Sequence, residues 1–146
     1  MHIKGCIALE ISIGVDGIYF EAMHITHGFL DIDLIPHGHT YRLSVEIYGK
    51  PGSEGYILDL RELERIVRSV ASNLDRSLIV PKGYTISDEV QTIFRKITIC
   101  DKGNPTLENM ALMIAENIYK LIGRKDIIVR VTLYEGASYF CRVSYP

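Results

Sequence analysis

The chain has 146 residues, of which 47% are hydrophobic and 23% are charged, and its formal net charge is -2. This length and composition predict a single domain over residues 1–146 with a sizeable core, and they argue against disorder. The sequence has no cluster of basic residues that would bind nucleic acid, and no apolar stretch is long enough to cross a membrane.

The cysteines indicate a reducing compartment. Cys6, Cys100 and Cys141 are odd in number, lie far apart and form no CxxC pair. Free, mostly buried thiols in the cytoplasm are the expectation for such a pattern. Residues 1–5 lack the features of a signal peptide, which also favours a cytoplasmic location.

Strand patterns come first along the chain. Residues 7–15 are apolar, rich in isoleucine and partly alternating, which predicts a β-strand. Asp16-Gly17 is a turn signal between two apolar runs, so residues 18–24 are expected to return as the second strand of a hairpin. Residues 28–36 are predicted to form a loop. Residues 40–48 alternate between apolar and polar side chains and predict a further strand.

Two amphipathic helices are predicted next. The first follows Asp59, a typical N-cap, and its apolar stripe recurs at helical spacing. That stripe consists of Leu60, Leu63, Ile66, Val67, Val70 and Leu74. The second helix is predicted over residues 107–121, with Thr106 as its N-cap and Gly123 as its stop. Residues 79–102, between the two helices, fit no single pattern.

A second pair of strands is predicted over residues 127–134 and 138–144, around a turn that contains Glu135. The chain thus runs from strands through helices to strands. This order predicts an α+β domain in which two helices cover one face of an antiparallel sheet.

Three histidines suggest a metal site. His37 and His39 are two residues apart, so in a strand their imidazoles lie on the same face of the sheet. His24 ends another apolar run, and a short hairpin would bring it opposite them. Three neutral imidazoles suit Zn²⁺ with one open position, as in catalytic zinc sites. The alternative is that these are ordinary surface histidines.

Several short motifs together resemble one known family, that of 6-pyruvoyl-tetrahydropterin and 6-carboxy-tetrahydropterin synthases. They occur in the order found in that family and cover nearly the whole chain. The motifs are Phe20-Glu21-Ala22-Met23-His24, His37-Gly38-His39-Thr40-Tyr41, Gly55-Tyr56-Ile57-Leu58-Asp59-Leu60, Leu74-Asp75, Asn104-Pro105-Thr106-Leu107-Glu108-Asn109 and Val131-Thr132-Leu133-Tyr134-Glu135.

The resemblance implies the tunnelling fold, with a four-stranded antiparallel sheet and two helices in each subunit. It also implies that sheets join edge to edge in trimers, that two trimers stack into a hexamer, and that active sites lie between subunits. His24, His37 and His39 match the zinc ligands of the family. Glu135 matches the acid that anchors the pterin ring. The implied substrate is 7,8-dihydroneopterin triphosphate.

Two other residues are candidates for substrate contact, each with a structural alternative. Glu108 equally suits the N-terminal end of a helix, where the macrodipole favours a carboxylate. Thr106 is also the predicted N-cap of that helix.

The chain departs from the family at its proton-transfer groups. The usual cysteine lies four residues before the first histidine of the His-Gly-His run, and here that position is Asp33. In a related subgroup a glutamate lies three residues before that histidine, and here that position is Leu34. The Asp-His pair of the family appears as Asp75-Arg76. An arginine stays charged and cannot shuttle a proton as histidine does.

Asp33 is the first substitute for the missing base, because a carboxylate near Zn²⁺ tends to stay ionised. His27 is a possible proton donor, although it also fits an exposed loop residue, and Asp31 ranks third. Asp75 remains as the acid of the former pair.

Three functional hypotheses follow. The first is a zinc-dependent lyase that acts on 7,8-dihydroneopterin triphosphate or a related pterin. The second is an aldolase-like enzyme that forms 6-hydroxymethyl-dihydropterin. The third is a zinc- and pterin-binding homologue without catalysis.

Overall fold

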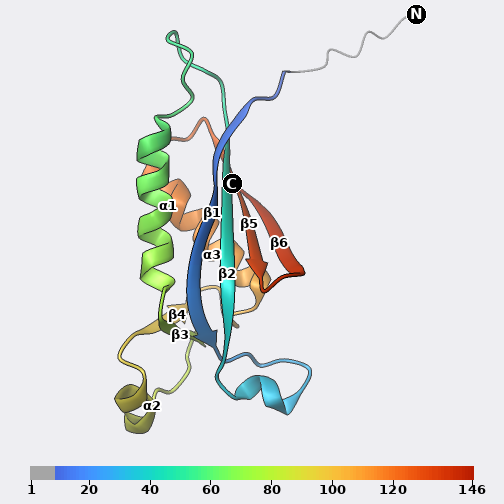
Figure 1. Ribbon diagram of the computed structural model, residues 1–146, viewed down its shortest axis with the longest axis vertical. Helices are drawn as coiled ribbons and strands as arrows, with labels where there is room; N and C mark the ends of the chain where they lie inside the picture. The colour runs from blue at the N-terminus through green and yellow to red at the C-terminus, as the bar shows by residue number, and fades with distance from the viewer. Residues whose placement is uncertain (1–8) are drawn as a thin grey trace, which may run out of the picture.

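The computed structural model describes residues 9–146, so Cys6 and the start of the predicted first strand lie outside the described residues. Figure 1 shows a long, twisted sheet with helices packed against one face. The elements are β1 (Ser12–His24), the 3-10 helix η1 (Asp31–Leu34), β2 (His37–Tyr48), α1 (Leu60–Leu74), β3 (Ser77–Pro81), α2 (Asp88–Ile93), β4 (Ile97–Cys100), α3 (Leu107–Ile122), β5 (Ile128–Glu135) and β6 (Tyr139–Tyr145).

The sheet has six strands in the order β4-β3-β1-β2-β5-β6. Strands β1, β2, β5 and β6 pair antiparallel, and these four form the predicted sheet. Strands β3 and β4 extend it with parallel pairs beside the end of β1. The α+β class is confirmed, whereas the count of four strands is too low. The additional strands come mostly from the segment 79–102, which had no clear pattern in sequence.

The predicted hairpin at Asp16-Gly17 is wrong, because β1 continues through this pair as a single strand. Its register against β2 shifts between Val15 and Ile18, which leaves one extra residue on β1. Gly17 has a φ of 75°, a conformation that glycine adopts easily. The extra residue shifts which side chains of β1 point to the core by one position, so that both Val15 and Ile18 face the core. A bulge thus keeps both apolar runs buried without a turn.

Two helices cover one face of the sheet, as predicted (Figure 1). Asp59 caps α1 by accepting a hydrogen bond from the backbone N–H of Arg61. Thr106 caps α3 through the N–H of Asn109, and Gly123 ends α3 in the left-handed conformation. These caps confirm the predicted helix ends within one residue. The buried stripes of both helices pack on alternate residues of β1, β2 and β5.

The strand register places the candidate site at one end of the sheet. His24 is the last residue of β1 and pairs with His37, the first residue of β2. The segment leading into α3 passes the same end, because the carbonyl of Pro105 contacts the His24 ring. Glu135 ends β5 and pairs with Tyr41 of β2. Among residues 9–146, no helix is both long and apolar enough to cross a membrane.

Candidate metal centre

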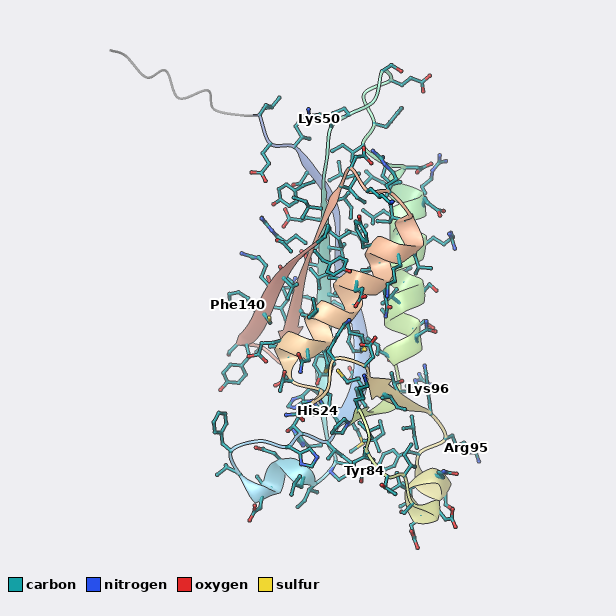
Figure 2. The ribbon with its side chains drawn as sticks, turned by 180° about the vertical axis from the view of Figure 1, so that it is seen from behind. His24, Lys50, Tyr84, Arg95, Lys96 and Phe140 are labelled. Carbon is teal, nitrogen blue, oxygen red and sulfur yellow. The ribbon has the colours of Figure 1, made fainter. Side chains whose placement is uncertain are left out.

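Three imidazoles converge at the end of β1 and β2, as the sequence predicts. The potential ligand atoms of His24, His37 and His39 all lie within 4.8 Å of one another. The ring centroids of His24 and His37 are 4.4 Å apart, and those of His37 and His39 are 5.3 Å apart. The spacing of two residues along β2 places His37 and His39 on the same face, and the antiparallel pairing of β1 with β2 brings His24 beside them. His24 is visible beneath the N-terminal end of α3 in Figure 2.

Backbone carbonyls fix the orientation of two of these rings. His24 Nδ1 lies 2.9 Å from the carbonyl oxygen of Pro105, and His37 Nδ1 lies 2.9 Å from that of Ile35. A carbonyl only accepts, so each Nδ1 carries the proton and each Nε2 is left with a free lone pair. This is the tautomer in which histidine binds a metal through Nε2.

The buried nitrogen of His24 supports a metal at this position. His24 is 4% exposed, and its Nε2 has no hydrogen-bond partner among the described residues. Burial, which is the largest influence, lowers the pKa of His24 and keeps its ring neutral. A buried nitrogen without a partner is costly, and a metal ion would relieve that cost. The donor set and its protonation therefore fit a divalent metal ion.

Glu135 lies beside the histidines and is held by a buried tyrosine. Its Oε1 is 3.8 Å from Nε2 of His39, and its Oε2 accepts a hydrogen bond of 3.3 Å from the Tyr41 hydroxyl. Burial and the neighbouring Glu135 charge together raise the pKa of Tyr41, so Tyr41 remains a hydrogen-bond donor. The Glu135 side chain is 19% exposed, so part of the carboxylate is accessible.

Asp33 lies in η1 and contacts its own loop. Its Oδ2 accepts a hydrogen bond of 3.3 Å from the N–H of Leu30, and its backbone carbonyl accepts one from Thr26. No hydrogen bond to Oδ1 is present within residues 9–146. Asp33 is outside the three-histidine cluster. One carboxylate oxygen thus supports the loop, and the other is available.

The Asp75-Arg76 pair is attached to β1. Asp75 Oδ1 accepts a hydrogen bond of 2.9 Å from the N–H of Glu21, and the N–H of Arg76 donates to the Glu21 carbonyl. Arg76 has a φ of 57°, which is uncommon for a residue with a side chain. This turn joins the end of α1 to the middle of the sheet.

The other candidates occupy the surrounding loops. His27 is exposed, and the side-chain amide of Asn104 both accepts from its N–H and donates to its carbonyl. Thr106 has its predicted role as an N-cap. Glu108 is exposed in the first turn of α3, and Asp31 is exposed in η1.

The cysteines in the described residues do not resemble activated nucleophiles. Cys100 is buried and Cys141 is partly buried, and neither forms a disulfide. Burial is the main cause that raises the pKa of both thiols, which lowers the fraction of reactive thiolate.

Sequence reasoning missed several supporting residues. Tyr41 and Asn104 are part of motifs quoted above, but their contacts to Glu135 and His27 depend on the fold. Glu21 was also missed, although one signal was available. It is a charged residue between buried Phe20 and Ala22, and alternation along a strand places it on the opposite face.

Sequence comparison finds relatives with pterin-related names. A protein of Pyrococcus horikoshii named putative 6-carboxy-5,6,7,8-tetrahydropterin synthase is 31% identical over 75% of this chain and 74% of its own length. A 6-carboxy-5,6,7,8-tetrahydropterin synthase of Rickettsia bellii is 28% identical over 86% and 95%. A dihydroneopterin monophosphate aldolase of Pyrococcus furiosus is 31% identical over 70% and 73%.

Structural comparison agrees on the fold. The crystal structure of 6-pyruvoyl tetrahydropterin synthase from Plasmodium vivax superposes with a TM-score of 0.76. The match covers 94% of this chain and 98% of the other, at 19% identity. The family model of 6-pyruvoyl tetrahydropterin synthase matches residues 15–145, a range that includes the three histidines, Asp33, the Asp75-Arg76 pair and Glu135. The chain therefore belongs to the 6-pyruvoyl tetrahydropterin synthase family.

Proposed function

We propose that this protein is a zinc-dependent lyase that acts on 7,8-dihydroneopterin triphosphate or a closely related pterin. The observation that carries this proposal is the cluster of three histidines beside a partly exposed glutamate, in a chain of this family. The histidines supply the metal ligands, and the glutamate supplies a group that recognises the ring.

The residues divide the chemistry among them. A zinc ion held by His24, His37 and His39 would supply Lewis acidity toward hydroxyl groups of the pterin side chain. Glu135 accepts two hydrogen bonds from the N–H edge of the ring, and Tyr41 fixes the orientation of the carboxylate. Asp33 removes a proton from the side chain through its available oxygen.

A second activity is supported by the two substitutions in the site. Asp33 and Arg76 replace the cysteine and the histidine of the family, and a relative at 31% identity is named dihydroneopterin monophosphate aldolase. An aldolase reaction would cleave the bond between the first and second carbons of the side chain and give 6-hydroxymethyl-dihydropterin and a two-carbon hydroxyaldehyde. A pterin-binding homologue without catalysis is the third possibility.

Product analysis decides among these functions. The zinc-loaded protein is incubated with 7,8-dihydroneopterin and with its monophosphate and triphosphate, and the pterins are separated by chromatography. We expect loss of triphosphate with formation of a pyruvoyl-tetrahydropterin, or of a carboxy-tetrahydropterin together with a two-carbon aldehyde. Formation of 6-hydroxymethyl-dihydropterin would establish the aldolase instead, and unchanged substrate in every incubation would contradict both enzymes.

Asp33→Asn tests the proton-transfer group in the same assay. The variant keeps an oxygen that can accept from the N–H of Leu30, so the loop should persist while the basic group is lost. We expect the rate to fall by about 10²-fold or more, the usual scale for loss of a general base. Alkylation of the cysteines should leave the rate intact. Full activity in Asp33→Asn, or inactivation by alkylation, would remove Asp33 from the mechanism.

Metal content tests the histidine cluster. The purified protein should hold about one Zn²⁺ per chain, the stoichiometry of a single tetrahedral site. His37→Ala and His39→Ala should each lower the content strongly by elemental analysis. His27→Ala is a matched control, because this exposed histidine lies outside the cluster and should retain zinc. Equal metal content in all four proteins would contradict the site.

Calorimetry tests the ring anchor. Glu135→Gln keeps the shape of the side chain but removes its charge, and a charged acceptor contributes roughly 1.5–3 kcal/mol. We therefore expect neopterin to bind about tenfold more weakly or worse. Glu108→Gln, measured beside it, shows whether Glu108 also contacts the ring. Unchanged affinity in Glu135→Gln would exclude Glu135 from the site.

We also propose a hexamer made of two trimers. Within residues 9–146, β3 pairs with β1 only over Ala22–His24, and Asp75 and Arg76 bond the backbone of Glu21, so the part of β1 before Glu21 has no strand beside it on that edge; β6 forms the opposite edge of the sheet. The loop after β1 exposes an apolar patch, which in a soluble protein is typical of an interface. Its exposed side chains are Phe29, Leu30, Ile32, Leu34 and Ile35.

Light scattering tests the assembly. The expected mass is six times that of the 16.5 kDa chain. Phe29→Ser, which removes the most exposed apolar side chain of the patch, should shift the population toward smaller species. A stable monomer of the unaltered protein would contradict the hexamer and any site shared between subunits.

A further inference from the structure

The loop between β1 and β2 is tied to the distant part of the chain by one side chain. This loop, residues 25–36, carries Asp33, and in Figure 1 it extends in light blue beyond the lower ends of both strands. Within the described residues, the hydrogen bonds of residues 26–36 stay inside the loop or reach the adjoining strand β2, with two exceptions. Both exceptions are made by the side chain of Asn104.

The amide of Asn104 matches the backbone of His27 on both sides. Its Oδ1 accepts a hydrogen bond of 2.9 Å from the N–H of His27, and its Nδ2 donates one of 2.8 Å to the carbonyl of His27. A side-chain amide can accept and donate at once, whereas a carboxylate only accepts. The pair of bonds therefore depends on the amide, and it fixes both the position and the orientation of the backbone at residue 27.

The segment that carries Asn104 is itself held in place. The backbone carbonyl of Asn104 accepts a hydrogen bond of 2.8 Å from Nδ2 of Asn109, in α3, and another of 2.8 Å from the N–H of Thr106. The preceding carbonyl, on Gly103, accepts one of 3.0 Å from the N–H of Lys82, which directly follows β3. The loop is thus anchored to a segment that is fixed by α3 and β3.

The residues on either side of His27 contact Asp33. The N–H of Thr26 donates to the backbone carbonyl of Asp33 at 2.9 Å, and the N–H of Leu30 donates to its Oδ2 at 3.3 Å. Gly28 lies so close to the same Oδ2 that a Cβ atom would not fit there. Because these contacts surround residue 27, the position of the Asp33 carboxylate follows from the position of this anchored residue.

We propose that Asn104 is a positioning residue for the proton-transfer step and that it acts by holding Asp33 in place through the backbone of His27. This inference rests on the proposed function, since it takes Asp33 as the base. A base must stay within hydrogen-bond reach of the proton that it removes, and a misplacement of about 1 Å can cost 10²-fold in rate. Asn104 fulfils this role without contact to the substrate.

Steady-state kinetics of an isosteric variant test the role. Asn104→Asp keeps the acceptor for the N–H of His27 but loses the donor and places a negative charge against the carbonyl. With 7,8-dihydroneopterin triphosphate and with its monophosphate, we expect kcat to fall about tenfold or more, while KM and zinc content are unchanged. Asn117→Asp makes the same change at an exposed position of α3 and should behave as the unaltered protein does.

A double variant shows whether Asn104 acts through Asp33. Once the base is removed, its exact position no longer matters, so Asn104→Asp combined with Asp33→Asn should be no slower than Asp33→Asn alone. A residue that merely supports the structure would lower the rate by the same factor whether or not Asp33 is present.

Hydrogen exchange measures the anchor without any substrate. The peptide that covers residues 26–36 should exchange faster in Asn104→Asp than in the unaltered protein, because local opening of the loop costs less once the contact is weakened. Asn104→Ala, which removes both hydrogen bonds, should show a larger increase. In Asn117→Asp the same peptide should exchange as in the unaltered protein.

The outcomes separate the inference from the proposed function. Unchanged exchange of residues 26–36 in both Asn104 variants would overturn the anchor. A raised KM with unchanged kcat, or independent losses in the double variant, would overturn the positioning role, and none of these results would contradict the lyase itself. No turnover of either pterin by the unaltered protein would overturn the proposed function and the role of Asn104 with it.

Discussion

The antiparallel register between β1 and β2 is the constraint on which the site depends. It places His24 opposite His37, and Ala22 opposite His39, so the three imidazoles meet at one end of the sheet. A slip by one residue would move a whole strand face from the core to solvent. The core residues further along β1 and β2, such as Phe20 and Tyr41, whose stacked rings are 5.0 Å apart, therefore hold the three histidines in place. The packing of the core and the geometry of the histidine cluster thus depend on the same strand register.

The same register explains why the site combines buried and accessible groups. His24 is fully enclosed between β2, β3 and the carbonyl before α3, whereas His37 and His39 at the strand start remain partly exposed. A metal bound here would be held from the buried side and approached from the open side. That asymmetry is typical of catalytic metal sites, which keep one position for water or substrate.

The sequence was sufficient for the parts of the structure that repeat with a fixed period. The stripes and caps of α1 and α3 are local, and the pair His37 and His39 follows from alternation along one strand. The Asp16-Gly17 bulge was misread because a turn and a bulge use the same residues, and only pairing with β2 distinguishes them. Strands β3 and β4 are short and lie between loops, so their pattern was too brief to recognise. The contacts of Tyr41 with Glu135 and of Asn104 with His27 join residues far apart in the chain, which no local pattern can reveal.

The loop that carries Asp33 also constrains how this chain can evolve. A Cβ atom at Gly28 would lie 2.1 Å from Asp33 Oδ2, so any side chain there would push the carboxylate aside. Gly28 does not have a positive φ, so a glycine is needed at this position for space and not for the backbone conformation. Which side chains fit at position 28 therefore depends on the residue at position 33. A smaller side chain at position 33 would remove this contact and leave room for a side chain at position 28, so the two positions are sterically coupled.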